Sequence, residues 1–521
     1  MPREVIGAHG GGGSVWSAAS PTPQGISQLP MPQTMQNTEL LRIYVKLISQ
    51  FKASLDGNPD ASNPYIKYYV PYSVQSPLLV HVAIYTGAGF LSQMGHIDTT
   101  VAMSHKGHAI ALLNEHLQSN SSTSDEGIAG VVQLIVNEWY WGDPNDLRAH
   151  LRGLREMIRI RGGFRTLGLH GLLSKLAITS DVAIALSFEI SPFLRGGKEF
   201  EFHENTQTAP LRLALNTPLV SSLASFASCD EALHIHSATA SILDDMRFLI
   251  AAALALPKNA STKELQKVHS TSAWIYERIS MLPRLAPATR RPSSVTSPIP
   301  SSTASLIIES SSRDTPEVGE EQREPRGSHK RPRRGKSQGS PPQQHRGLLT
   351  PTQALAENKD HRYGLEQSPP PPGEETPDFV YQAVLLGALM YSRAIMTRQP
   401  FSQVVGTDSF VQLWTTMWRV PLATWRSLLG VFNWLVLPLV PSGKSTHHDL
   451  YVRSMMNASL LQMSMDNWEI ACGAMDAALR LQHWLGAEGH GSDSASSPSD
   501  SGAGNGRRES SSEGEGDVKE S

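Results

Sequence analysis

The stretch DPNDLRAHLRGLREMIRIRGG, residues 143–163, is typical of one complete amphipathic helix. Asp143 can cap the helix, and Pro144 suits the first helical position, where a missing backbone N–H does no harm. One apolar face follows at spacings of i, i+4, i+7 and i+11, formed by Leu147, Leu151, Leu154 and Ile158. Gly162 can adopt the left-handed backbone that ends many helices. The stretch therefore predicts a helix from Pro144 to Arg161 that packs one side against a core.

Two sets of polar residues each line one face of a helix, and the two helices are different. Four arginines lie together about 100° around the helix from its apolar face, at Arg148, Arg152, Arg155 and Arg159. They could hold phosphates or an acidic partner, but we favour a solvated face that is helped by Glu156. Three histidines share a face of an earlier helix, at His105, His108 and His116. Because apolar residues share that face too, we favour hydrogen-bonded histidines over a metal site.

The helical pattern extends around this stretch over residues 37–283 and returns over 376–487. Ser261 begins the four-residue pattern of a capping box, and a long apolar stripe follows it. Thr376-Pro377 is typical of the start of the first helix in the second block. Since neither block contains a run of alternating strand residues, the sequence predicts an all-α fold.

Three segments lack the pattern and are predicted to be disordered: 1–36, 284–375 and 488–521. The first is rich in Gly, Pro, Ser and Gln, the second in Pro, Ser, Thr, Gln and charge, and the last is acidic and rich in Ser and Gly. Such compositions bury too little apolar surface to offset the entropy lost on ordering. We interpret 284–375 as an insertion, with the two helical blocks forming one multi-helix assembly around it.

Charge and cysteine content narrow the class of protein. The net charge is −3 and the pI is near 6.7, so no overall field attracts the chain to nucleic acid or to acidic membranes. Cys229 and Cys472 are too few for a disulfide framework and indicate a reducing compartment. The N-terminal residues carry no apolar signal, and the most apolar run, 428–440, is interrupted and too short to span a membrane. We expect a soluble intracellular protein without membrane contact.

The segment His150–Gly163 is similar to the signature of the fungal-specific transcription-factor domain. Similar fragments follow in the same order, at 167–173, 181–186, 274–279, 379–383 and 425–430. The resemblance extends over about 40–485 without the insertion. It implies the all-α regulatory region of a zinc binuclear cluster transcription factor. It also implies a nuclear protein that regulates transcription with partners from the transcription machinery or among related factors.

The zinc cluster of that family does not occur in this sequence. The cluster needs six cysteines that hold two zinc ions beside a helix that enters the major groove, whereas the first 228 residues contain no cysteine. We therefore expect no direct sequence-specific DNA binding by this chain and no metal or other cofactor. The sequence leaves open whether it is a partial member of the family or whether an upstream exon encodes the cluster.

A basic run in the middle segment is a candidate nuclear localisation signal. Five of the eight residues from 329 to 336 are cationic, namely Lys330, Arg331, Arg333, Arg334 and Lys336. An import receptor binds an exposed run of this kind, and a solubilising charge cluster is the alternative. The same segment holds five candidate phosphorylation sites before proline, at Ser297, Thr315, Ser340, Thr350 and Ser368. Phosphates there would weaken the receptor contact, unless these dipeptides occur by chance in a proline-rich segment.

No enzyme motif is complete. The segments Gly87–Ser92 and Gly443–Ser445 resemble parts of nucleotide-binding loops, but each lacks a required glycine. Asp244-Asp245 resembles the aspartate-rich motif of helical terpenoid synthases, yet Phe248 replaces the last acidic ligand. We predict no catalytic, cofactor-binding or metal-binding residues.

Taken together, these features favour a transcriptional regulator-type protein that acts through protein contacts or by sensing a small effector of unknown identity. The alternative is a scaffold that forms homo- or heterodimers, or a dominant-negative partner of full-length relatives. A helical enzyme is less favoured, because no intact acid–base or metal set occurs.

Overall fold

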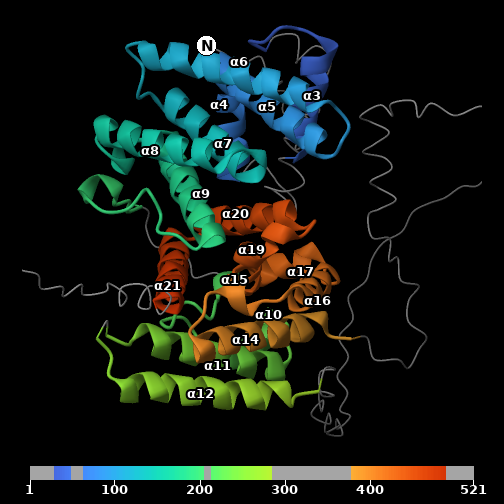
Figure 1. The fold of residues 1–521 in the computed structure, drawn as a ribbon, viewed down its shortest axis with the longest axis vertical. Coiled ribbons are helices and arrows are strands. Elements are labelled where there is room, and N and C mark those ends of the chain that lie inside the picture. Colours follow the sequence, from blue (N-terminus) through green and yellow to red (C-terminus); the bar gives the residue numbers. More distant parts are fainter. Residues whose placement is uncertain (1–28, 48–62, 205–212, 258, 284–376, 488–521) are drawn as a thin grey trace, which may run out of the picture. The chain divides into compact units, whose positions relative to one another are not determined.

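A computed structural model describes residues 29–47, 63–204, 213–257, 259–283 and 377–487. Every regular element in these ranges is a helix, which confirms the all-α prediction (Figure 1). The expected insertion and both expected disordered ends fall almost wholly outside the described residues, so the division of the chain at 36, 284, 376 and 488 stays a prediction.

The α-helices of the first block lie in chain order as α3 (Met35–Leu47), α4 (Val70–Ser73), α5 (Pro77–Gln93), α6 (Thr99–Gln118), α7 (Asp125–Trp141), α8 (Pro144–Arg161), α9 (Leu172–Phe188), α10 (Asp230–Leu233), α11 (Ser237–Leu254) and α12 (Thr262–Ser280). Those of the second block are α14 (Phe379–Thr397), α15 (Phe401–Val404), α16 (Thr407–Trp418), α17 (Leu422–Ser427), α18 (Leu429–Val436), α19 (Leu439–Ser442), α20 (Asp449–Asp466) and α21 (Trp468–Gly486).

Helix α8 has the bounds that its sequence predicts. Asp143 caps it by accepting the backbone N–H of Asn145 at 2.7 Å. Gly162 ends it in the left-handed region, with φ 99° and ψ 18°. The four residues of the apolar face are buried, at Leu147, Leu151, Leu154 and Ile158. Local sequence therefore determines both ends of this helix and its buried side.

Two further predicted helix starts have different outcomes. The capping box of α12 is present, because the backbone N–H of Ser261 donates to Glu264 at 2.7 Å and Glu264 N–H donates back to Ser261 at 3.3 Å. Helix α14, however, begins at Phe379 and not at Thr376-Pro377. The reason is that Asp378, a strong capping residue, accepts the N–H of Tyr381 at 2.9 Å.

The helices of both blocks form one compact unit. Helices α11, α12 and α14 pack side by side, and α9 packs on α20 and α21 (Figure 1). The Ser272 hydroxyl of α12 donates to the Ser392 carbonyl of α14 at 2.9 Å, with both residues fully buried. The Tyr381 hydroxyl donates to the Pro283 carbonyl at 2.9 Å. The core thus extends across the break at 284–376.

Two helical stretches are long and apolar enough to cross a membrane, Leu169–Phe188 and Phe379–Thr397, and a bent pair, Lys67–Ser73 with Pro77–Gln93, would be a third. The most apolar windows of the first two are 83% and 61% buried inside the fold. Other helices cover their apolar residues, as a core helix requires. The run 428–440 differs, because it forms the short helices α18 and α19 around Pro438.

Candidate ligand pocket

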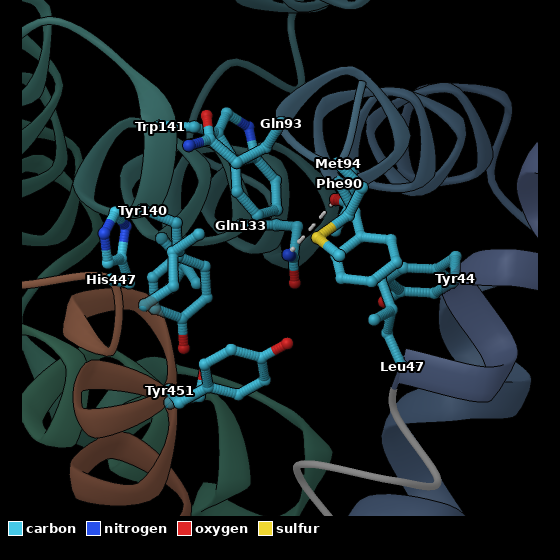
Figure 2. A pocket seen from close by; sticks show the side chains of 14 residues that line it. Tyr44, Leu47, Phe90, Gln93, Met94, Gln133, Tyr140, Trp141, His447 and Tyr451 are labelled. Carbon is cyan, nitrogen blue, oxygen red and sulfur yellow. Dashed lines mark hydrogen bonds between the residues drawn. The ribbon is translucent and has the colours of Figure 1, made fainter. Parts of the chain in front are cut away.

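A pocket of about 240 Å³ lies where α20 of the second block meets α3, α5 and α7 of the first (Figure 2). Its lining is mainly aromatic and aliphatic, with a few amides and hydroxyls. It consists of Tyr44, Leu47, Thr86, Phe90, Gln93, Met94, Gln133, Val136, Tyr140, Trp141, His447, Leu450, Tyr451 and Ser454. Gln93, Met94 and His447 are exposed and form a rim, whereas Tyr44, Thr86, Gln133 and Val136 are buried.

Two glycines of α5 allow the helices around the pocket to approach closely. A Cβ at Gly87 would lie 2.3 Å from the Leu40 carbonyl oxygen of α3. A Cβ at Gly89 would lie 2.4 Å from the indole nitrogen of Trp141, which lines the pocket. Because real Cβ atoms do not come so near, any other residue would push α3 or the indole away. The Gly87–Ser92 segment is therefore a packing motif on a helix and not a nucleotide-binding loop.

The buried wall of the pocket carries an amide with one unused acceptor. The Gln133 amide nitrogen donates to the Thr86 hydroxyl at 3.5 Å, and that hydroxyl donates to Asn137 at 3.0 Å. The Gln133 carbonyl oxygen accepts no hydrogen bond from any described residue, although Gln133 is only 5% exposed. Figure 2 shows this amide between Phe90 and Tyr140, with the Tyr451 hydroxyl pointing into the same space.

Two hydrogen-bonded contacts join α7 to α20 beside the pocket. The Tyr140 hydroxyl bonds with Ser454 and Asn457 of α20. The Arg453 guanidinium of α20 donates to the Trp139 carbonyl and to Asp449. Burial raises the pKa of Tyr140 and also that of Tyr44, so both phenols stay neutral at physiological pH.

The lining contains no Asp, Glu, Lys or Arg among its 14 residues, and His447 stands at the exposed rim. A charged ligand in this pocket would lose its water without gaining an opposite charge from these 14 residues, which is strongly unfavourable. The described lining is therefore suited to binding a neutral, flat molecule.

The arginine face of α8 divides into structural and exposed members. Arg155 donates to the Arg195 carbonyl at 2.8 Å and to Gly196 at 3.3 Å, and its guanidinium lies 4.1 Å from the Phe200 ring centre. Arg159 pairs with Glu156 at 2.6 Å. Arg148 and Arg152 are exposed. The four side chains therefore do not converge on one anion site.

The three predicted histidines of α6 have different surroundings. His116 bonds to the Ser124 hydroxyl at 2.8 Å, as expected for a hydrogen-bonded histidine. The His108 ring packs edge-on against His81 with centres 4.5 Å apart. Burial lowers the pKa of His105. Among the described residues no group of three His, Cys, Asp or Glu side chains could hold a metal ion.

The remaining enzyme-like motifs have structural roles. Asp244 accepts the backbone N–H groups of Phe226 and Ala227 at 2.8 and 3.0 Å. Arg247, which is 7% exposed, donates to Asn216 at 2.6 Å and to the Ala224 carbonyl at 2.7 Å. Together they fasten the loop before α10. Gly443–Ser445 is a 3-10 turn, with the Lys444 ammonium 4.4 Å from the Phe188 ring centre.

The basic run at Lys330, Arg331, Arg333, Arg334 and Lys336 lies outside the described residues, as do the candidate phosphorylation sites Ser297, Thr315, Ser340, Thr350 and Ser368. Sequence reasoning did not find the pocket, whose residues come from four helices far apart in the chain. A signal did exist, since glycines inside a helix are unfavourable and two of them at Gly87 and Gly89 indicate close packing.

Comparison with known proteins gives one match. The family model of the fungal specific transcription factor domain matches residues 39–291, which contain α5 to α12 and most of α3. This match agrees with the resemblance noted at His150–Gly163. Neither a curated protein nor a solved structure shows significant similarity to the chain.

Proposed function

Since residues 39–291 match the family model of the fungal specific transcription factor domain, we propose that this chain is a nuclear transcriptional regulator that acts through protein contacts under the control of a small effector. The single observation that carries this proposal is the family match, since that domain is the regulatory part of transcription factors. The pocket supports the effector, because a ligand there would touch both helical blocks at once.

The proposal assigns DNA recognition to a partner or to a related factor. These 521 residues hold two cysteines, Cys229 and Cys472, and a binuclear zinc cluster needs six. Cys229 is buried, and burial raises the pKa of Cys472 to about 12, which disfavours the thiolate that binds zinc. Nuclear entry is assigned to the run Lys330, Arg331, Arg333, Arg334 and Lys336, with the five proline-directed sites as its regulators.

A promoter assay tests the regulatory function. The full chain is fused to an unrelated DNA-binding domain and directed to a reporter gene. We expect reporter output to rise or fall several-fold relative to the DNA-binding domain alone. The control is a fusion that carries Leu154→Asp, which places a carboxylate in the core and should abolish the effect through unfolding. A folded fusion without any effect would overturn the proposal.

The same fusion, together with sedimentation of the chain, distinguishes a regulator from the alternative of a dimerising scaffold. Such a scaffold would be silent when tethered to a promoter, would sediment as a dimer, and would reduce the output of a full-length relative expressed beside it. A regulator that contacts the transcription machinery changes the tethered reporter whether or not it dimerises.

A further inference from the structure

We propose that the pocket between α7 and α20 binds an uncharged aromatic molecule of one or two fused rings that carries a hydroxyl or N–H donor. This inference depends on the proposed function only for its biological meaning, because the binding can be measured without a promoter. Three properties of the lining lead to it: its size, its charge and the unused acceptor of Gln133.

The size of the pocket limits the ligand. A cavity of about 150 Å³ lined by apolar side chains holds one benzene ring, and pockets for drug-sized ligands begin near 300 Å³. The present pocket, at about 240 Å³, lies between these values and suits one ring or two fused rings. Phe90, Tyr140, Trp141 and Tyr451 offer ring faces and edges, and these pack best against another flat ring.

The charge of the lining excludes ions. Among the described residues, no carboxylate, ammonium or guanidinium lines the pocket, and burial keeps the Tyr44 and Tyr140 phenols neutral. The neighbouring Arg453 is already occupied by Asp449, to which it donates at 2.9 Å, and by the Trp139 carbonyl. A ligand carboxylate or ammonium would therefore be buried without a charged partner among the described residues.

The hydrogen-bonding groups of the lining indicate that the ligand carries a donor. The Gln133 amide nitrogen is used by Thr86, whereas its carbonyl oxygen is left without a donor among the described residues. A ligand hydroxyl or N–H placed on that oxygen would complete its bonding. A ligand that fills the pocket displaces water from that oxygen, so a ligand without a donor should leave the acceptor unpaired and bind more weakly.

The position of the pocket gives the ligand a regulatory effect. Its rim at Met94 and His447 is exposed, so the ligand can enter from solvent. Once bound, it touches α5 and α7 of the first block and α20 of the second, and so it stabilises the arrangement in which the two blocks are docked. Any ligand that binds only this arrangement raises the thermal midpoint of unfolding.

Titration calorimetry and thermal unfolding of the purified full chain test the inference with four probes of one shape. These are 2-naphthol, 2-methoxynaphthalene, naphthalene and 2-naphthoate. We expect 2-naphthol to bind and to raise the melting temperature. The methoxy compound and naphthalene, which lack the donor, should bind about tenfold more weakly. Naphthoate, which is charged, should bind weakest.

Variants locate the binding. Gln133→Leu should weaken 2-naphthol about tenfold and leave naphthalene unchanged. Leu450→Trp should fill the pocket and abolish binding of all probes. Its matched control is Ile160→Trp, at a site that is 60% exposed on α8, which should bind like the parent chain. If Gln133→Leu fails to fold, the comparison of 2-naphthol with its methyl ether on the parent chain still decides the donor.

The results distinguish failure of this inference from failure of the proposed function. Equal binding of 2-naphthol and naphthoate, equal binding of 2-naphthol and its methyl ether, or no binding of 2-naphthol to the folded chain would each overturn the ligand class. The reporter assay is independent of these outcomes. A working regulator without naphthol binding refutes this inference alone, and naphthol binding with a silent reporter refutes the proposed function alone.

Discussion

Helix α8 and the contact between α7 and α20 are two regions of one core that depend on sequence in opposite ways. Helix α8 is determined within 21 residues, which contain its cap, its buried face and its terminating glycine. The α7–α20 contact joins residues that are more than 300 positions apart, such as Trp139 and Arg453. A local pattern thus specifies a helix and its buried side, whereas the pairing of buried sides comes from the whole chain.

The largest expected effect comes from expressing the second helical block without the first. Residues 376–487 expressed alone should show no cooperative thermal transition. Their α14 face lacks α11 and α12, and their α20 and α21 faces lack α9. Isolated helices of this length are marginal in water. Circular dichroism and calorimetry measure the outcome.

The control for that fragment is the chain with residues 284–375 replaced by a short Gly/Ser linker. It should keep one cooperative transition, because loop closure depends only weakly on length. A monomeric 376–487 fragment with a sharp transition of its own would show that the second block is an independent domain.

A smaller perturbation of the same contact is Tyr140→Phe. The ring stays, but Ser454 and Asn457 lose their partner in a partly buried site. We expect the free energy of unfolding to fall by about 2 kcal/mol. Chemical denaturation measures it, with Tyr276→Phe in α12, a half-buried tyrosine, as the matched control. Equal effects of the two substitutions would mean that Tyr140 does not hold the blocks together.

The pH dependence of stability tests the loop that α8 contacts. Asp181 of α9 accepts the N–H groups of Phe193 and Leu194 at 3.0 and 2.8 Å, in the loop that Arg155 of α8 also grips. Burial raises the pKa of Asp181 to about 6. The folded state therefore binds more protons than the unfolded state between the ordinary carboxyl pKa and about 6. Stability should fall as pH rises through that window, by at most about 1.4 kcal/mol per pH unit.

Urea denaturation across this window, on the parent chain and on Asp181→Asn, isolates the effect from other titrating groups. The difference between the two free energies of unfolding should change with pH in the stated direction. A difference that stays constant would mean that Asp181 titrates normally in the folded chain.

The smallest expected effects distinguish two arginines on one face of α8. Arg155→Ala should reduce the free energy of unfolding by about 1 kcal/mol, because three backbone carbonyls lose their donor. Arg152→Ala should change it by less than about 0.5 kcal/mol, since this side chain is exposed. Denaturant titrations of both variants measure the two values. Equal losses would show that the whole face is structural, and an unchanged Arg155→Ala would show that none of it is.

These regions also show how far sequence reasoning extends. The bounds of α8 and the capping box of α12 follow from local chemistry, so both were predictable. The start of α14 was misplaced because Thr376 and Asp378 both suit a cap, and only the folded chain decides between them. Periodicity likewise could not separate Arg155 from Arg152, since both lie on one face and only the loop near Phe193 distinguishes them.

The pocket could not be predicted for a similar reason. Its wall needs Tyr44, Gln133 and Tyr451 to converge, and no spacing in the sequence relates them. Gly87 and Gly89 did carry information, but glycine pairs occur in phosphate loops as well as in tightly packed helices. The described residues before α5 contain no strand, and this favours close packing over a phosphate loop.

The hydrogen bond from Tyr381 to the Pro283 carbonyl has an evolutionary consequence. It brings the chain back beside the point where it leaves the helices, so the span between these two residues is a natural place for a lineage to gain or lose sequence. Doubling the length of such a span adds only about 0.6 kcal/mol to the free energy of closing it. An engineer can therefore place a fluorescent reporter at this point while α12 and α14 stay paired.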